Sequence, residues 1–296
     1  MKRLLFIVNP ISGKRSKDKI VKKIVSCIDM KKYDVTMRFS SYPGHSNEIA
    51  KEAVKSGIDV VVAVGGDGTV NEVASALLWT SSVLGIIPCG SGNGLARHLG
   101  IPINVRKAVE ILNNGEVEMI DSLSVNEKPC FCTAGVGYDA YVSYEYAKES
   151  SRGLGTYVRK ALRGWLAYSP QEYIIKTKSQ IFKRKAVLIT CANANQWGNG
   201  FHIAPKASLK DGLMDVTIIH PLRWRYVFAM PFQILGYTFD KNPDVETYQV
   251  NDLLIKRNDN SPVHIDGEPL FCENDMRVVV HKNSVKVFKN NICRVC

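Results

Sequence analysis

The sequence predicts a two-domain α/β protein, with a parallel doubly wound sheet in the N-terminal half and a mostly antiparallel β domain after it. Strand and helix patterns alternate as far as residue 115, and glycine-rich loops follow several of the expected strands. From about Val117, short runs rich in Val, Ile and Tyr alternate with turn residues. The length of 296 residues exceeds a comfortable single core, which also favours two domains.

The strands and helices of the first half are predicted from the spacing of apolar residues. The expected strands are Arg3–Val8, Tyr33–Phe39, Val60–Val64 and Val83–Ile87. The expected helices are Ser16–Ile28, Ser46–Lys55, a segment that begins at Thr69, and Val105–Leu112. Because about ten to fifteen helical residues separate successive strands, the connections must be crossovers. Such crossovers produce a parallel sheet with helices on both faces.

The second half is predicted to contain short strands with few helices between them. The expected strand runs are Pro129–Val142, Tyr173–Thr177, Lys185–Ala192, Met214–Ile219, Asp252–Lys256, Val263–Asp266 and Met276–Val280. Turn residues separate these runs, which is typical of an antiparallel β domain.

The stretch Val60–Glu72 is the main candidate for an anion site. Its apolar residues end in Gly65-Gly66-Asp67-Gly68, which predicts a strand, a glycine turn and a helix. We expect the three glycines to adopt positive φ angles and to let an anion reach bare N–H groups at the positive end of the helix. Thr69 and Glu72 have the spacing of a capping box. A tight strand-to-helix turn without a ligand is the alternative.

Asp67 indicates what kind of anion this loop would bind. Its carboxylate would repel a phosphate unless a divalent cation lay between them, so the loop favours a metal-bound nucleotide. Two further loops, Asn9–Lys14 and Pro88–Asn93, also follow strands. Since the carboxyl ends of parallel strands share one edge of the sheet, the three loops should converge on one crevice. Arg97 follows the third loop and suits a phosphate or a carboxylate.

Several function classes are less favoured by the sequence. Neither the nucleotide P-loop signature nor G-x-G-x-x-G occurs. The apolar run Leu4–Val8 is too short for a signal peptide, and Tyr226–Phe239 is too short for a membrane span. We therefore expect a cytoplasmic protein with reduced thiols among its 8 cysteines, of which Cys293 and Cys296 form half a zinc site at most.

The charge balance suggests an anionic partner. The net charge is +11, from 39 Lys and Arg against 28 Asp and Glu. Nucleic acid, a nucleotide and an acidic membrane surface all fit this charge, as does a plain solvated basic face. A basic and aromatic segment from Arg152 to Tyr168, which includes Arg159, suits a lipid surface or a single-stranded nucleic acid.

Three motifs of the second half carry carboxylates on turns. Asp266-Gly267-Glu268 could supply a proton acceptor, and Asp211-Gly212-Leu213 could offer oxygen ligands to Mg²⁺. Gly135-Val136-Gly137-Tyr138-Asp139 could place a carboxylate beside a substrate hydroxyl or amine. An acidic turn, an Asp-Gly turn and a β-bulge are the respective structural alternatives.

Taken in order, the motifs span nearly the whole chain: NPISGK, GGDGTVNE, PCGSGNGLARHLG, Asp121, AGVGYDA, KDGLMD and IDGEPL. This order resembles the diacylglycerol kinase catalytic-domain family, which includes bacterial lipid kinases and sphingosine kinases. That family is related in fold to NAD kinases and phosphofructokinases. Gly94 stands where many relatives have Asp.

The resemblance implies an ATP-binding α/β domain over residues 1–122 and a β-sandwich lipid-substrate domain over 123–274, with 275–296 returning to the first. It implies that Glu268 is the catalytic base and that Asp67 lies near the reacting phosphates. The implied nucleotide-binding residues are Asn9, Lys14, Ser40, Gly65, Gly66, Asp67, Gly68, Thr69, Asn71, Glu72, Gly90, Ser91, Asn93 and Arg97. The implied substrate residues are Asp121, Asp139, Arg152 and Arg159. The implied Mg²⁺ ligands are Asp67, Ser208, Asp211 and Leu213.

The expected function is therefore an ATP- and Mg²⁺-dependent lipid kinase that acts peripherally at a membrane, with no nucleic-acid partner. An NAD kinase and a catalytically silent lipid- or nucleotide-binding regulator are the alternatives. The sequence does not distinguish between diacylglycerol, a sphingoid base, phosphatidylglycerol and a polyprenol as the lipid that accepts the phosphate. Members of that family commonly form homodimers, so the resemblance implies a homodimer.

Overall fold

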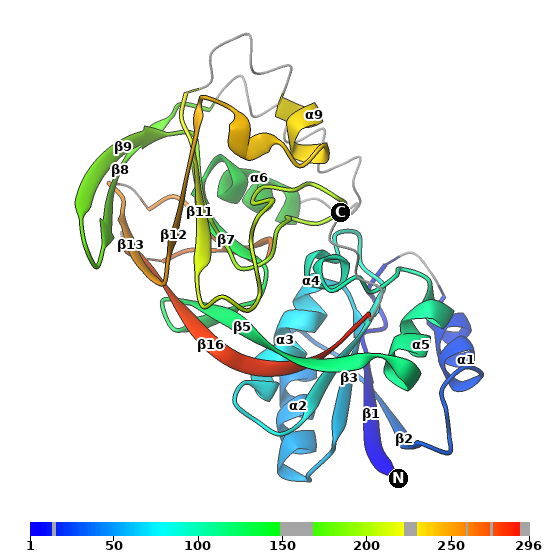
Figure 1. Cartoon of the computed structure of the whole chain (residues 1–296). Coiled ribbons are helices and arrows are strands. Elements are labelled where there is room, and N and C mark those ends of the chain that lie inside the picture. Colours follow the sequence, from blue (N-terminus) through cyan, green and yellow to red (C-terminus); the bar gives the residue numbers. More distant parts are fainter. Residues whose placement is uncertain (14–15, 149–167, 222–229, 259, 273–274, 291–296) are drawn as a thin grey trace. The chain divides into compact units, whose positions relative to one another are not determined.

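The computed structural model describes residues 1–13, 16–148, 168–221, 230–258, 260–272 and 275–290. The chain divides into two compact units (Figure 1). The first unit contains Met1–Ile120 and the chain from Asn283 onward, and the second unit contains Asp121–Lys282. Strands β5 (Glu116–Val125) and β16 (Asp275–Lys289) each have residues in both units.

A parallel sheet forms the centre of the first unit. Its strands lie in the order β2 (Tyr33–Phe39), β1 (Lys2–Val8), β3 (Val60–Gly65), β4 (Val83–Pro88) and the C-terminal part of β16. Every residue of β3 is buried, which explains its continuous apolar sequence, because a central parallel strand is covered on both faces. The parallel sheet predicted for this half is confirmed.

Helices cover both faces of this sheet. Helix α2 (His45–Lys55) packs on α3 (Asp67–Leu77), and α1 (Lys17–Val25) packs on α5 (Val105–Asn114). Figure 1 shows the first pair on one side of the sheet and the second pair on the other. The short helix α4 (Gly94–His98) follows β4. The doubly wound arrangement is therefore confirmed.

The second unit contains two layers of antiparallel strands. One sheet has the order β12 (Val245–Val250), β11 (Met214–Ile219), β10 (Leu188–Ala192), β7 (Thr133–Gly137), β14 (Val263–Ile265) and β15 (Glu268–Leu270). The other layer has β6 (Lys128–Cys130), β8 (Gln171–Thr177), β9 (Ile181–Ala186), β13 (Asp252–Lys256) and the adjoining parts of β5 and β16. Apolar side chains of both layers form one core, so the expected antiparallel sandwich is confirmed.

The expected strand over Pro129–Val142 is wrong in its second part. Helix α6 (Tyr138–Ala147) begins directly after Gly137, the last residue of β7. Gly137 has a φ of 97°, which turns the chain out of the strand. A second apolar cluster packs this helix and α9 (Met230–Leu235) against β10 and β11. A short 3₁₀ turn, η1 (Phe239–Lys241), follows α9. Among the described residues, no helix is long and apolar enough to span a membrane.

A charged network joins β9 to β12. Arg184 donates to Glu246 through Nε at 2.8 Å and through Nη2 at 2.9 Å, and His220 Nε2 lies 3.1 Å from the same carboxylate. The guanidinium, above all, lowers the pKa of Glu246 to about 2. Because the folded state depresses this pKa, the network stabilises the fold above pH 4.5, and the stabilisation disappears as pH falls through 2.

We expect Glu246→Gln to lower the free energy of unfolding by about 1–2 kcal/mol at pH 7. The pKa shift alone would give about 3 kcal/mol, but partial exposure to solvent reduces it. The difference from the wild type should shrink as pH falls from 4.5 towards 2, as urea denaturation at several pH values can show. Glu172→Gln on the exposed face of β8 is the control. A difference that does not change with pH would contradict this account.

Candidate functional site

Three loops meet at the carboxyl ends of β1, β3 and β4. Asn9 Nδ2 donates to Thr69 Oγ1 at 3.0 Å, which joins the first loop to the start of α3. Cys89 N donates to Gly65 O at 2.7 Å, which joins the third loop to the second. Gly13 leaves no room for a side chain, because a Cβ there would lie 2.0 Å from Cys89 O. The loops that follow three separate strands thus form one continuous structure.

The glycines of the second loop serve a different purpose from the one expected. Among the described residues, positive φ angles do not occur at Gly65, Gly66 or Gly68, so that prediction is wrong. They allow close packing instead: a Cβ on Gly65 would lie 2.4 Å from Thr69 Oγ1, and a Cβ on Gly90 would lie 2.6 Å from Gly66 Cα. Two backbones therefore approach each other where side chains would separate them.

Helix α3 begins earlier than the capping-box pattern predicts. Its first residue is Asp67 and its N-cap is Gly66, so the expected cap at Thr69 is wrong. The first-turn amides of an α-helix have no intrahelical partner. Among the described residues, the amides of Gly68 and Thr69 have no hydrogen-bond acceptor. These two donors, at the positive end of an 11-residue helix, suit an anion.

Asp67 fixes the third loop. Its carboxylate accepts hydrogen bonds from Asn93 N at 2.8 Å and from Gly94 N at 2.7 Å, where α4 begins. Asn93 has a φ of 55°, is buried, and accepts from Gly90 N at 3.0 Å through its side chain. The carboxylate thus sets the shape of the glycine loop as well as adding negative charge to it.

Two cations accompany the loops. Arg97 donates through Nε to Gly92 O at 3.0 Å, while its two terminal amino groups have no partner among the described residues. Lys17 donates to Ser12 Oγ at 3.0 Å, and burial lowers the pKa of its ammonium. Our sequence reasoning missed Lys17, since its only signal is its nearness to Lys14. Ser91 is exposed at the loop tip, whereas Ser40 is buried after β2.

Glu72 has a structural partner outside the loops. Its two carboxylate oxygens accept hydrogen bonds from Gly44 N at 2.8 Å and from Ser46 N at 3.1 Å, at the N-terminus of α2. Asn71, one residue earlier, accepts from Ser75 Oγ within α3. Glu72 therefore caps a neighbouring helix, which argues against the expected nucleotide contact.

We expect Glu72→Ala to lower the free energy of unfolding by about 2 kcal/mol, because the first-turn amides of α2 lose a charged acceptor. ATP affinity should stay within about threefold. Thermal denaturation and calorimetric ATP titration measure the two quantities. Glu110→Ala, at an exposed position of α5, is the control. Loss of ATP binding without loss of stability would restore the nucleotide assignment.

Asp121 and the turn at 208–213 form a polar cluster in the second unit. The buried carboxylate of Asp121 accepts from Gly212 N at 2.7 Å, and its amide donates to Leu209 O. Asp211 accepts from Leu213 N at 3.0 Å, and Ser208 Oγ accepts from Lys210 N at 3.3 Å. Burial, with a smaller contribution from the nearby charge of Asp211, raises the pKa of Asp215 to about 6.

Oxygen donors of this kind suit Mg²⁺. Among the described residues, no group of three or more His, Cys, Asp or Glu side chains lies close enough together to hold a metal ion. A cation on this turn would therefore need backbone carbonyls and water in addition to Asp211.

Asp139 is buried rather than open to a headgroup, with 4% of its surface exposed. Its Oδ2 accepts from Thr190 Oγ1 at 2.7 Å and lies 3.0 Å from His264 Nε2, while Oδ1 accepts from Ala140 N at 2.8 Å. This placement argues against the expected substrate contact. Our sequence reasoning missed Thr190 and His264, because single polar residues on strands carry no motif.

Glu268 is exposed and follows a tight turn. Asp266 and Gly267 have φ angles of 50° and 83°, and Ile265 pairs directly with Glu268 across the hairpin. The Asp266 side chain accepts hydrogen bonds from backbone amides of the segment before β7, at 3.0 Å from Phe131 N and 2.7 Å from Cys132 N. The hairpin is thus tied down just before the exposed carboxylate.

Several expected residues lie outside the described residues. They are Lys14, Arg152 and Arg159, together with most of the basic and aromatic segment and the Cys293 and Cys296 pair.

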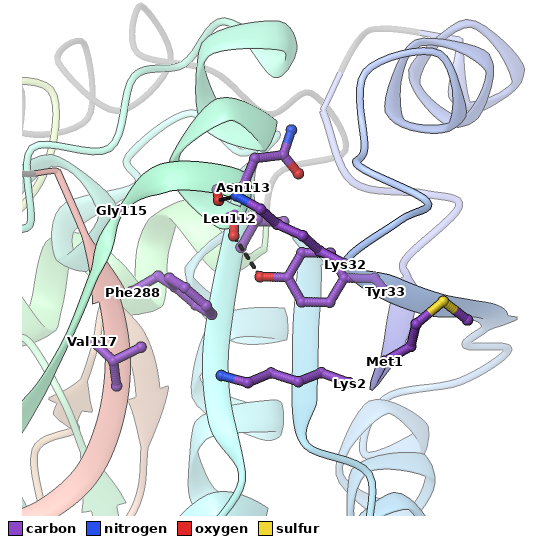
Figure 2. A pocket seen from close by; sticks show the side chains of 9 residues that line it. All are labelled: Met1, Lys2, Lys32, Tyr33, Leu112, Asn113, Gly115, Val117 and Phe288. Atoms are coloured by element: carbon purple, nitrogen blue, oxygen red, sulfur yellow. Dashed lines mark hydrogen bonds between the residues drawn. The ribbon is translucent and has the colours of Figure 1, made fainter.

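A cavity of about 570 Å³ lies elsewhere in the first unit, at the start of β1 and β2. Figure 2 shows Tyr33 donating to Leu112 O at 2.6 Å and Lys32 donating to Asn113 O at 2.7 Å beside it. The three loops instead follow the carboxyl ends of β1, β3 and β4, and none of the expected site residues lines the cavity. We therefore place the candidate site at the loops.

Comparisons with known proteins found two family models that match successive parts of the chain. Residues 3–125 match a family model described as the diacylglycerol kinase catalytic domain. Residues 132–289 match one described as the YegS C-terminal NAD kinase beta sandwich-like domain.

Similar proteins cover nearly the whole chain. A protein named "Diacylglycerol kinase" from Bacillus subtilis (strain 168) is 28% identical over 273 residues, which is 90% of each chain. One named "Probable lipid kinase YegS" from Escherichia coli O9:H4 (strain HS) is 26% identical over 272 residues, or 89% of each chain. A crystal structure of a diacylglycerol kinase from Bacillus anthracis str. Sterne superposes with a TM-score of 0.75 at 19% identity, covering 98% of this chain and 97% of that one.

Proposed function

This chain belongs to the diacylglycerol kinase catalytic-domain family, and on that premise we propose that it is an ATP-dependent lipid kinase. It would transfer the γ-phosphate of ATP to a lipid hydroxyl, with diacylglycerol as the first acceptor to test. A relative named "Diacylglycerol kinase" over 90% of its length supports this choice. The buried state of Asp139 supports it too, because a sphingoid ammonium would need an accessible carboxylate.

One observation carries the proposal for the nucleotide: donors without partners gather at the three loops. Among the described residues, these donors are the amides of Gly68 and Thr69 and the terminal amino groups of Arg97. Helix N-termini and guanidinium groups are the usual protein ligands of phosphate oxygens. We assign the phosphates of ATP to this place, with Asn9, Lys14 and Ser91 as further contacts.

The proposed reaction needs charge neutralisation and one proton acceptor. Mg²⁺ bound with ATP would supply positive charge beside the transferred phosphate. Asp67, the first residue of α3, would face this charge. Arg97 would neutralise phosphate charge, and the amides of α3 would orient the phosphates. Glu268 would take the proton from the lipid hydroxyl. The hydroxyl oxygen would then form a bond to the γ-phosphorus as the bond between that phosphorus and ADP breaks.

The oxygen-rich turn at 208–213 fits a second, structural role for Mg²⁺. Asp211 would supply the carboxylate, and the carbonyls of Ser208 and Leu213 would supply neutral oxygens. Asp121 would hold the turn in shape through its hydrogen bond from Gly212 N.

We also infer that the second unit docks on the lipid surface through α9 and the residues after it. Phe232, Leu235 and Tyr237 are 77%, 52% and 46% exposed there. Apolar side chains on a short amphipathic element can enter the headgroup region, and the net charge of +11 favours anionic lipid.

The double substitution Phe232→Ser and Leu235→Ser should weaken sedimentation with phosphatidylglycerol vesicles at least fivefold. Activity on a short-chain, dispersed diacylglycerol should stay within twofold. Ile181→Ser, which also replaces an exposed apolar side chain of the second unit, is the matched control. An equal loss of activity on dispersed diacylglycerol and on diacylglycerol in vesicles would contradict surface docking.

The function itself is tested with γ-labelled ATP, Mg²⁺ and mixed micelles that contain diacylglycerol, a sphingoid base, phosphatidylglycerol or a polyprenol. Chromatography of the lipids should show label in diacylglycerol and none without Mg²⁺. Label in NAD⁺ but in no lipid would overturn the proposal in favour of an NAD kinase. Bound ATP without any labelled product would overturn it in favour of a regulator.

A further inference from the structure

A buried polar bridge crosses three neighbouring strands of the second unit. Thr190 on β10 and His264 on β14 both lie beside Gly135 of the strand between them, β7. A Cβ on Gly135 would lie 2.6 Å from Asp139 Oδ2 and 3.0 Å from His264 Nε2. The missing side chain leaves the space into which α6 inserts Asp139. One carboxylate oxygen therefore joins the two outer strands across the middle one.

His264 takes part in this bridge at a cost in stability. The residue is 2% exposed, and among the described residues its buried Nδ1 has no hydrogen-bond partner. An unsatisfied buried ring nitrogen destabilises the folded state, whereas an apolar side chain would not. Asp139 is the polar partner of the ring. The arrangement suggests that the pair does more than hold the core together.

The position of His264 in the chain indicates what else the pair does. Strand β14 has three residues and leads through Asp266 and Gly267 directly to Glu268. Strand β15, which begins at Glu268, is at the edge of its sheet, and among the strands that the structure describes it pairs with β14 alone. The location of the Glu268 carboxylate thus depends on how firmly β14 is held, and His264 is the middle residue of β14.

We propose that Asp139 and His264 form a positioning pair that holds the hairpin carrying Glu268 in its reactive place. The inference rests on the proposed function, because it assigns a purpose to the location of Glu268. Neither residue touches the substrate in this account. Asp139 anchors His264, His264 fixes β14, and β14 fixes the carboxylate.

Kinetics test the proposal through a leucine and a glutamine variant. His264→Leu keeps the bulk but removes the donor to Asp139, so kcat should fall at least tenfold while KM for ATP stays within twofold. His264→Gln keeps an amide donor and should retain kcat within about threefold. Thr217→Val is the matched control, because it removes a buried side-chain hydrogen bond from β11 of the same sheet. A kcat loss in the control equal to that of His264→Leu would overturn the proposal.

The route through Glu268 is tested by combining substitutions. If His264 acts through Glu268, His264→Leu should change the residual activity of Glu268→Gln by less than about threefold. The same tenfold loss in both backgrounds would show that His264 acts elsewhere, and would overturn the proposal.

A third readout does not depend on activity, so it separates this inference from the proposed function. Amide hydrogen exchange of Ile265, Glu268 and Leu270 should be at least tenfold faster in His264→Leu than in the wild type, with exchange in β11 and β12 unchanged. If His264→Leu does not fold, Asp139→Asn provides the same comparison. Exchange that stays at the wild-type rate in the hairpin would overturn the positioning role, whatever lipid the protein phosphorylates.

Discussion

Replacing Glu268 by glutamine is expected to lower kcat by about 10²- to 10⁴-fold, with the affinity for ATP nearly unchanged. Glutamine has the size of the native side chain but cannot accept the proton of a lipid hydroxyl. Because Glu268 is exposed and follows a turn fixed by other residues, the substitution should leave the free energy of unfolding within about 0.5 kcal/mol.

The measurement is initial-rate kinetics with labelled ATP, together with calorimetric ATP titration and urea denaturation. Glu172→Gln, an exposed position on β8, is the control and should keep wild-type kcat. Full activity of Glu268→Gln would remove the general-base assignment and leave the fold and the nucleotide loops untouched.

Replacing Gly90 by alanine is expected to weaken ATP binding at least tenfold. The new Cβ would lie 2.6 Å from Gly66 Cα and 3.1 Å from Asn93 Oδ1, so the second and third loops would have to move apart. Such overpacking should also lower the free energy of unfolding by about 1–3 kcal/mol. The amides that we assign to phosphate lie in the first turn of α3, which follows the displaced loop directly, and their alignment should be lost with it.

Gly200→Ala is the matched control for this experiment. Its Cβ meets nothing within 4 Å, and its φ of +80° adds only local backbone strain of about 1–2 kcal/mol. ATP affinity should therefore fall in Gly90→Ala and not in Gly200→Ala. Wild-type affinity in Gly90→Ala would mean that the nucleotide binds elsewhere.

The sequence was sufficient for the parallel half because its inner strands are buried on both faces, while the edge strand β2 alternates exposed with less exposed residues. Val60–Val64 is apolar throughout, and β2 has the predicted bounds, Tyr33–Phe39. The clustering of the three loops followed from the topology alone, since parallel strands place their carboxyl ends at one edge. The resemblance to the diacylglycerol kinase catalytic-domain family is likewise confirmed.

What the sequence could not provide was the partner of each polar group. Glu72 has capping-box spacing to Thr69, yet its carboxylate caps α2, which comes earlier in the chain. Gly66 was expected to need a positive φ, but the actual constraint is the backbone of Gly90. In both cases a distant segment sets the role, and local spacing carries no information about it.

Helix α6 was missed for a related reason. Tyr138, Tyr141 and Val142 favour strands by propensity, and the segment has no clear apolar face. The helix forms because Gly137 turns the chain and because Asp139, in the first turn, reaches Thr190 and His264. Tertiary contacts of this kind override local preference.

The last strand has a consequence for the order in which the protein can fold during synthesis. Strand β4 pairs with β3 on one side and, through Val83 and Leu84, with Lys286 and Val287 of β16 on the other. When Pro88 leaves the ribosome, that second partner has still to be made, and translation needs on the order of ten to forty seconds to reach it. Until then β4 has an unpaired edge that other chains can extend. A nascent chain stalled before residue 283 should therefore aggregate, although its nucleotide loops are already complete.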